Sequence, residues 1–459
     1  MSEQERICSL GAGELLGAYR RAELTPPEAV AALLERARDV GERLGAFTVL
    51  CAERAAREAQ ASAERWRAGE ARPLEGLPFA VKDLVDTADV VTAYGSTHHV
   101  GHVPDRDAPV VAALRAAGAI LIGKTTTHEY AWGITTVSAH AVTARNPWDP
   151  ERIAGGSSGG SAVAVVAGAV PMAVGTDTGG YVRIPAAMCG ATGFKPTYGA
   201  LSTEGVFPLA PSLDHVGLLA RSPADVALVL RHLRPLDAEA PGEPAGRLGV
   251  SEAPSPAVAA ALEALAAARP VDVRTVAWPG GEEALEPFAT IQRAEAAATH
   301  RERGLFPRGA EDYGADVLAR LRLAQRLELK DHVAATAQRE LLRARCLEAL
   351  AGVDLLVLPV VPCVPPRIDA LDAATDDMLR RTVLSQTVLQ NLAGLPACTV
   401  PTGWFPEGTP TAVQLVGRPF EDPAVLRAAA ELQALLDNSS GRRGPSLHTL
   451  PLPAGEARA

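Results

Sequence analysis

Apolar and polar residues alternate with two different spacings along this chain, one typical of helices and one typical of buried strands. The order in which the two patterns occur indicates an α/β protein. Before residue 70, apolar positions recur every three or four residues, which predicts helices. Further on, short apolar runs typical of buried strands alternate with helical segments. We expect helices over 14–19, 26–40, 51–69, 108–117, 162–168, 222–233 and 255–268, and strands over 77–81, 119–122, 172–175 and 354–361.

The rest of the pattern suggests no division into repeats or linked domains. Residues from about 282 to 350 are rich in Ala, Leu, Glu and Arg, which favours further helices. Residues 235–247 contain Pro, Gly and Glu and are expected to form a surface loop.

Composition narrows the function classes. The formal net charge of -10 gives no broad electrostatic attraction for nucleic acid or an anionic membrane. The opening MSEQERICSL lacks a secretory pattern, and the apolar runs are too short to cross a bilayer. The six cysteines are scattered without metal-ligand spacing. We therefore expect a cytoplasmic protein with reduced thiols, no metal and no cofactor.

Two short patterns resemble ligand sites that their surroundings do not support. GAILIGKT over 118–125 fits the phosphate-loop expression, but its four variable positions are themselves the predicted strand, whereas that loop must follow a strand. His98, His99 and His102 lie among glycine and proline residues rather than on one helix face, so loop histidines are favoured over a metal site.

GSSGG over 156–160 has two further interpretations. It fits the nucleophile elbow of α/β-hydrolases, with Ser158 attacking and His215, His300 or His332 as the base. It also resembles a flexible linker, but its neighbours are not low in complexity. A second glycine-rich segment, TDTGG, follows after one helix and one strand, and such turns let backbone N–H groups approach an oxyanion.

Seven sequence blocks occur in a fixed order along nearly the whole chain: GLPFAVKD, RAAGAILIGKTTTHEYAWG, RNPWDPERIAGGSSGGSA, GTDTGG, RIPAAMCGATGFKPT, SLDHVGLLARS and NLAGLPACTVP. In these blocks the chain resembles the amidase signature family. The resemblance implies one α/β/α domain over residues 1–459, with a mixed, twisted central sheet covered by helices. Its parts would be a helical segment over about 1–70, a signature core over about 76–220 and a variable helical and C-terminal part over about 221–459. It also implies a small-molecule amide or acyl substrate and a homodimer.

The family mechanism uses two serines and a lysine, and its positions map onto this sequence. The base falls on Lys82 and the bridging serine, which usually carries a cis peptide, on Ser157. The base needs burial to lower its pKa before it can accept a proton. The oxyanion-binding backbone falls on Thr178, Gly179 and Gly180, together with the N–H of the nucleophile itself. The nucleophile position holds Tyr181 in place of serine.

Tyr181 changes the expected chemistry. A phenol oxygen lies about 6 Å from its Cα, against about 2.4 Å for a serine, so an attacked carbonyl would be displaced from the oxyanion donors. We therefore expect a non-hydrolytic or altered acyl or amide reaction, with Tyr181 as a hydrogen-bond donor or acid. One alternative is a hydrolytically silent pseudo-amidase that binds a ligand or partner. Another is an amidohydrolase that uses Tyr181 or a neighbouring hydroxyl, such as that of Ser158 or Thr178.

Overall fold

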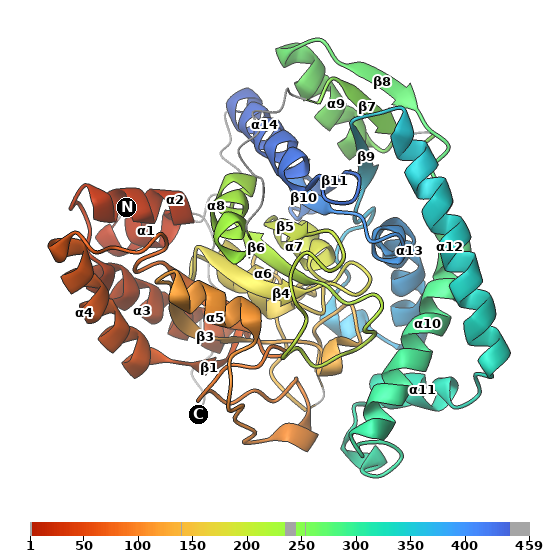
Figure 1. Ribbon diagram of the computed structural model, residues 1–459, viewed down its shortest axis with the longest axis horizontal. Helices are drawn as coiled ribbons and strands as arrows, with labels where there is room; N and C mark the ends of the chain where they lie inside the picture. The colour runs from red at the N-terminus through yellow and green to blue at the C-terminus, as the bar shows by residue number, and fades with distance from the viewer. Residues whose placement is uncertain (1, 139, 235–244, 253, 441–459) are drawn as a thin grey trace.

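Eleven strands form one mixed sheet in the part of the chain that the computed structural model describes, residues 2–138, 140–234, 245–252 and 254–440 (Figure 1). Their order is β1-β3-β2-β4-β6-β5-β10-β11-β9-β7-β8. This arrangement confirms the expected α/β fold. The strands are β1 (Phe47–Leu50), β2 (Pro78–Lys82), β3 (Ile120–Thr125), β4 (Met172–Thr176), β5 (Thr192–Lys195), β6 (Val216–Ala220), β7 (Arg247–Val250), β8 (Asp272–Thr275), β9 (Leu355–Pro359), β10 (Ala397–Trp404) and β11 (Pro410–Val416).

The pairing of β2 and β4 brings two polar residues together at one sheet edge. Strand β2 runs parallel to both β3 and β4, with Val81 opposite Val174. Parallel neighbours end at the same edge of a sheet. Lys82, the last residue of β2, therefore lies beside Thr176, the last residue of β4.

The helices lie on both faces of this sheet. They are α1 (Glu3–Ser9), α2 (Ala12–Arg20), α3 (Pro26–Leu44), α4 (Ala52–Ala68), α5 (Pro109–Ala116), α6 (Gly159–Val166), α7 (Arg183–Cys189), α8 (Pro223–Leu233), α9 (Pro256–Ala268), α10 (Gly281–Glu302), α11 (Ala315–Ala324), α12 (Leu329–Ala351), α13 (Ala373–Leu392) and α14 (Asp422–Ser440). Short 3-10 helices cover Thr97–His99, Glu129–Ala131, Ala310–Asp312 and Ile368–Ala370.

Alternate residues of the central strands enter two different apolar clusters. Phe79 and Val81 of β2 join one cluster with Val226 of α8, whereas Ala80 between them joins the other, with residues of α3 and α6. Side chains alternate between the faces of a strand, so these clusters are the two sides of the sheet. The packing explains why the central strands read as continuous apolar runs.

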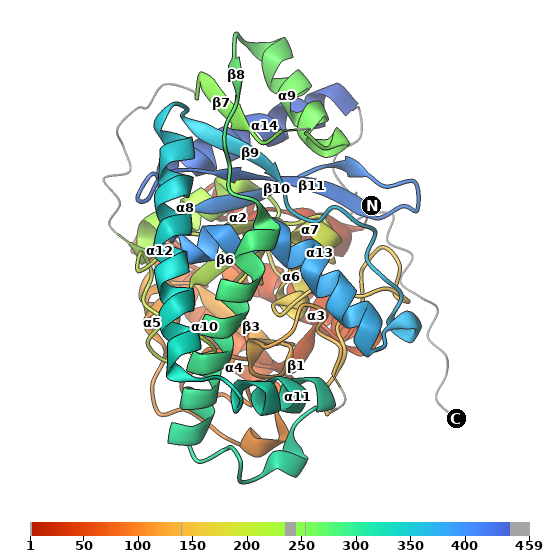
Figure 2. The same cartoon turned by 90° about the vertical axis from the view of Figure 1, so that its right-hand side faces the viewer.

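Helices α10 to α13 form a group beyond α7, which rests directly on the sheet. Helix α10 packs against α11, α12 and α13, and α13 packs against α7. Figure 2 shows this group across the front of the molecule. The group therefore covers the segment between β4 and α7, where TDTGG lies.

Most predicted elements are present, with two corrections. The expected loop over 235–247 is wrong at its end, because Arg247 begins β7, where its backbone pairs with the parallel strand β8. The part over 235–244 lies outside the described residues. The strand expected over 354–361 is shorter, Leu355–Pro359, and is parallel to β7 but antiparallel to β11.

The helices are also too short or too polar to cross a membrane. Among the residues described, none of them combines the length and the apolar character that a bilayer requires.

Candidate active site

The amine of Lys82 lies in direct contact with the hydroxyl of Ser157. The Nζ atom is 2.7 Å from Ser157 Oγ and 2.7 Å from Thr176 Oγ1. Lys82 comes from β2, and Ser157 comes from the turn before α6, after a cis Gly156–Ser157 peptide bond. The sheet therefore supplies two of the three polar groups, and a glycine-rich turn supplies the third.

Burial sets the protonation state of this lysine. Lys82 has no exposed surface, and burial lowers its pKa well below the usual range, although Asp177 and Asp214 act in the opposite direction. Desolvation disfavours the charged form of a group. A neutral amine at this position can accept a proton from the Ser157 hydroxyl.

The carboxylate of Asp177 shapes the TDTGG turn. It accepts backbone N–H groups from Gly180 at 2.7 Å, from Val182 at 3.2 Å and from Arg183 at 3.4 Å. The N–H groups of Thr178, Gly179 and Tyr181 donate to no residue in the described ranges. Buried backbone donors rarely stay unpaired, so these three are available to a developing oxyanion. The N–H of Gly180, expected in the same role, is instead used to hold the turn.

Two helices press against this turn where it consists of glycine. A Cβ atom on Gly179 would lie 2.5 Å from the ring of Phe288 in α10. Gly180 has a φ of +116°, and a Cβ there would lie 2.5 Å from Thr387 Oγ1 in α13. The Thr387 hydroxyl donates to Gly179 O at 2.6 Å. Glycine is therefore needed for close approach at the first position and for backbone conformation at the second.

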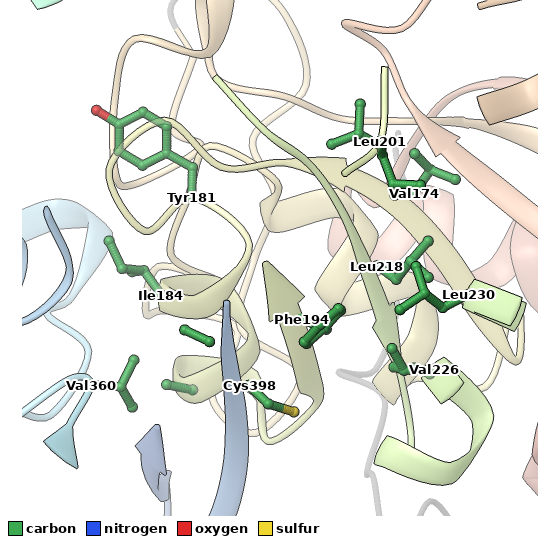
Figure 3. Packing of buried hydrophobic residues seen from close by; sticks show 14 of the residues in the cluster. Val174, Tyr181, Ile184, Phe194, Leu201, Leu218, Val226, Leu230, Val360 and Cys398 are labelled. Carbon is green, nitrogen blue, oxygen red and sulfur yellow. The ribbon is translucent and has the colours of Figure 1, made fainter. Parts of the chain in front are cut away.

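Tyr181 is fully buried, and its oxygen is bonded to α10 rather than to the lysine and serine. Gln292 Nε2 donates to the phenol oxygen at 3.0 Å, and Gln292 Oε1 accepts Trp132 Nε1–H at 3.0 Å. Figure 3 shows the tyrosine oxygen pointing away from the core residues around Phe194 and Leu218. No hydrogen bond joins Tyr181 to Lys82 or Ser157 within the described part of the chain.

The other neighbouring hydroxyls have structural partners. Ser158 Oγ donates to Thr176 O at 3.2 Å, with no histidine bonded to it among the described residues. Thr178 Oγ1 donates to Asp214 Oδ1 at 2.6 Å, and burial raises the pKa of that carboxyl group to about 6. Among the described residues, neither hydroxyl forms a hydrogen bond with Lys82, and Ser158 has no histidine partner to act as the base that a nucleophile elbow requires.

A family model described as Amidase matches residues 28–426. The chain belongs to the amidase family. A glutamyl-tRNA(Gln) amidotransferase subunit from Roseiflexus sp. (strain RS-1) is 36% identical over 469 residues, covering 92% of this chain and 95% of the relative.

Solved structures extend the similarity to the whole architecture. A crystal structure of an amidase has a TM-score of 0.84 at 36% identity and covers 93% of this chain and 99% of that one. The structure of 6-aminohexanoate cyclic dimer hydrolase with its substrate has a TM-score of 0.84 at 28% identity and covers 97% of this chain and 100% of that one.

These comparisons correct the expected chemistry. The non-hydrolytic or altered reaction and the silent pseudo-amidase are both wrong, because relatives that match nearly all of this amidase are named as amidotransferase subunits, an amidase and a hydrolase. Tyr181 replaces one side chain, whereas the lysine, the bridging serine position and the unpaired N–H groups are all present.

Sequence reasoning missed several residues that build the amidase site. Arg183 pairs with Asp177, and its guanidinium also donates to Gln390 at 3.1 Å and to Asn391 at 2.7 Å. Gln292 holds Tyr181 from α10. The sequence did contain an indication of the first pair, since Asp177 and Arg183 are charged residues within the glycine-rich block. It contained no indication of Gln292, which lies in an ordinary helical pattern.

The phosphate-loop-like segment and the histidine cluster, neither of which was expected to bind a ligand, occupy structural positions in this chain. Lys124 of 118–125 is within β3 and fully buried, and its amine donates to Thr87 and Thr92 at 3.0 and 2.8 Å. His98 and His102 contact Ser96, Gly309 and Tyr94. No group of His, Cys, Asp and Glu residues suited to a metal ion occurs in the described ranges.

Proposed function

We propose that this amidase hydrolyses the C–N bond of a small-molecule carboxamide, with Lys82 as the base and Ser157 as the attacking hydroxyl. The observation that carries the proposal is the 2.7 Å contact between a fully buried lysine amine and Ser157 Oγ. A serine activated by a neutral lysine is a known variant of the serine hydrolase arrangement.

The reaction has two steps, acylation of Ser157 and hydrolysis of the resulting ester. Lys82 removes the hydroxyl proton while Ser157 Oγ bonds to the carbonyl carbon, and the N–H groups of Thr178 and Gly179 receive the oxyanion. The C–N bond then breaks, and the proton on Lys82 passes to the leaving amine. A water molecule attacks the Ser157 ester, gives a proton to Lys82 and releases the carboxylic acid as the serine regains its proton.

Hydrogen bonding favours Ser157 over Tyr181 as the nucleophile. The tyrosine oxygen accepts from Gln292, which would oppose its attack on a substrate, and it has no contact with the base among the described residues. Its distance from Cα would also carry an acyl group away from Thr178 and Gly179. We assign Tyr181 to the wall of the substrate site and Ser158 to support of the turn through Thr176.

Covalent labelling with a fluorophosphonate tests this assignment. The wild type and the Tyr181→Phe variant should gain one adduct on the peptide containing Ser157, located by mass spectrometry. Ser157→Ala should gain none, and Ser158→Ala is the matched control that keeps the adduct. An adduct on Tyr181, or amide hydrolysis that survives Ser157→Ala at the wild-type rate, would overturn the assignment.

The remaining expectations form part of the same proposal. The substrate is a small amide, and the protein works in the cytoplasm. The net charge of -10 and the similarity to an amidotransferase subunit support these two expectations. The homodimer and the division of residues 1–459 into three parts stay predictions. Sedimentation measurements and limited proteolysis test them.

A further inference from the structure

Arg380 is a cation of α13 for which the described residues provide no hydrogen-bond or ion-pair partner. It lies in α13, is half-buried, and its Nη1 atom is buried without a hydrogen bond. No ion pair or hydrogen bond joins its guanidinium to another residue in the ranges described. A buried donor of this kind is costly unless a ligand satisfies it.

The position of Arg380 on α13 directs it toward the catalytic turn. Thr387 and Asn391 of the same helix bond to Gly179 O and Asp177. Arg380 precedes Thr387 by seven residues, about two helical turns, so the three share one face. The tyrosine at 181 lies within electrostatic range of the Arg380 guanidinium.

The acidic groups that face Arg380 are already paired with other cations. Asp316 accepts from Arg320 Nη1 at 2.6 Å and contacts His128 Nε2 at 2.9 Å. Asp376 accepts from Arg320 Nη2 at 3.1 Å. Arg320 thus uses both carboxylates and adds a second positive charge near Arg380. The two guanidinium groups and the two carboxylates cancel in charge, but both carboxylates bond to Arg320, and Arg380 Nη1 has no hydrogen-bond partner among the described residues.

We propose that Arg380 binds a carboxylate group of the substrate, so that this amidase prefers anionic amides. The inference rests on the proposed hydrolysis, because it names the substrate class of the same site. A guanidinium matches a carboxylate with two parallel N–H bonds and stays charged at every physiological pH. The carboxylate would lie on the α13 side of the site, apart from the amide held at Thr178 and Gly179.

A matched pair of substrates tests the proposal. One is the mono-anilide of a linear dicarboxylic acid, and the other is its methyl ester, which differs in the anionic group. The wild type should hydrolyse the acid with a kcat/KM about tenfold to a hundredfold higher, as expected for a charged hydrogen-bonded contact. Arg380→Gln should lose this preference, mostly through a higher KM, and should leave the ester within about twofold.

Two further variants separate recognition from a loss of structure. Arg381→Gln removes the neighbouring arginine, which is 68% exposed and paired with Asp377, and should keep the preference. Arg380→Lys retains the charge without the planar fork and should give an intermediate value. Equal rates for acid and ester in the wild type, or an equal loss on both substrates in Arg380→Gln, would overturn the proposal.

Binding of glutarate distinguishes this inference from the proposed hydrolysis. Calorimetry should detect binding to the wild type that weakens with added salt and is lost in Arg380→Gln. If neither anilide is hydrolysed but glutarate still binds through Arg380, the proposed hydrolysis fails and the anion site stands. If glutarate binds both proteins equally, the anion site fails.

Discussion

The guanidinium of Arg183 holds the carboxylate of Asp177 through two parallel hydrogen bonds, from Nε to Oδ2 and from Nη2 to Oδ1, each 3.1 Å long. Both side chains are fully buried. Burial raises the pKa of Asp177, but Arg183 outweighs this effect and holds the pKa well below its usual range. The carboxylate stays ionised and can orient the backbone of the catalytic turn.

Replacing this arginine by lysine should be costly. Arg183→Lys keeps the charge but loses the planar pair of bonds, so we expect about 3–5 kcal/mol less free energy of unfolding in urea. Arg247→Lys is the matched control, because Arg247 pairs with Asp354 at the surface and should lose under about 1 kcal/mol. Equal losses in the two variants would contradict a structural role for the buried pair.

Two buried lysines on adjacent strands separate catalysis from stability. Lys82→Met should lower kcat/KM by about 10²- to 10⁴-fold without unfolding the protein, because a general base contributes about that much. Lys124→Met removes an equally buried lysine whose amine donates to Val85 O, Thr87 and Thr92 and lies 3.9 Å from Asp83. It should lower the melting temperature while its folded fraction keeps a near-normal kcat. The assignment of Lys82 to catalysis and Lys124 to stability fails if both variants lower kcat/KM alike, or if both lower only the melting temperature.

Tyr181→Ser should increase hydrolysis. A serine at this position would stand in the family's nucleophile position, next to the N–H groups that Thr178 and Gly179 leave unpaired. We expect at least about tenfold faster hydrolysis of small primary amides, since such groups act as a unit. The measurement is a steady-state assay over aliphatic and aryl amides, with circular dichroism to verify folding. No gain across the panel would mean that the surrounding site has diverged as well.

The pH dependence should follow two buried groups that act in the same direction. Asp214 has a pKa raised to about 6, and protonation below that value removes the charge that accepts from Thr178. Burial lowers the pKa of Lys82, and its protonation would also remove the base. We expect kcat/KM to fall as pH drops through about 6, and Asp214→Asn to remove the part of that fall that Asp214 causes. A profile that stays flat between pH 5 and 8 would argue against it.

A buried histidine should make the fold sensitive to acid. His300 contacts the Tyr313 hydroxyl at 2.6 Å, and burial lowers its pKa to about 3. The unfolded chain takes up this proton near pH 6.5 and the folded chain does not, so stability is lost as pH falls below 6.5. His300→Asn should reduce the slope of the unfolding free energy against pH, by an amount that grows below pH 6.5 and approaches about 1.4 kcal/mol per pH unit at the acid end of urea titrations at pH 5 to 7.5. An unchanged slope would indicate that His300 is protonated in the folded state.

A helix or strand can be predicted from the sequence when its burial requires apolar residues in a run or at regular spacing. Strands β2 and β4 are fully buried and were predicted, whereas β8 is exposed at all four residues and has no apolar signal. The candidate lysine and serine follow from motif positions. Gln292 and Arg380 could not be found, because a helical pattern shows which face is apolar but not which polar residue reaches a turn from another part of the chain.

The distance along the chain between the catalytic turn and its supports affects how the protein is made. Asp177 and Arg183 bond to Thr387, Gln390, Asn391 and Gln414, at sequence separations of 204 to 231 residues. A ribosome adding 5–20 residues per second needs about 10 to 40 seconds to synthesise 200 residues. During that interval the nascent chain already contains every glycine-rich motif but lacks the partners that order them. The reactive centre is therefore completed late in synthesis, when α13 and β11 have emerged and docked.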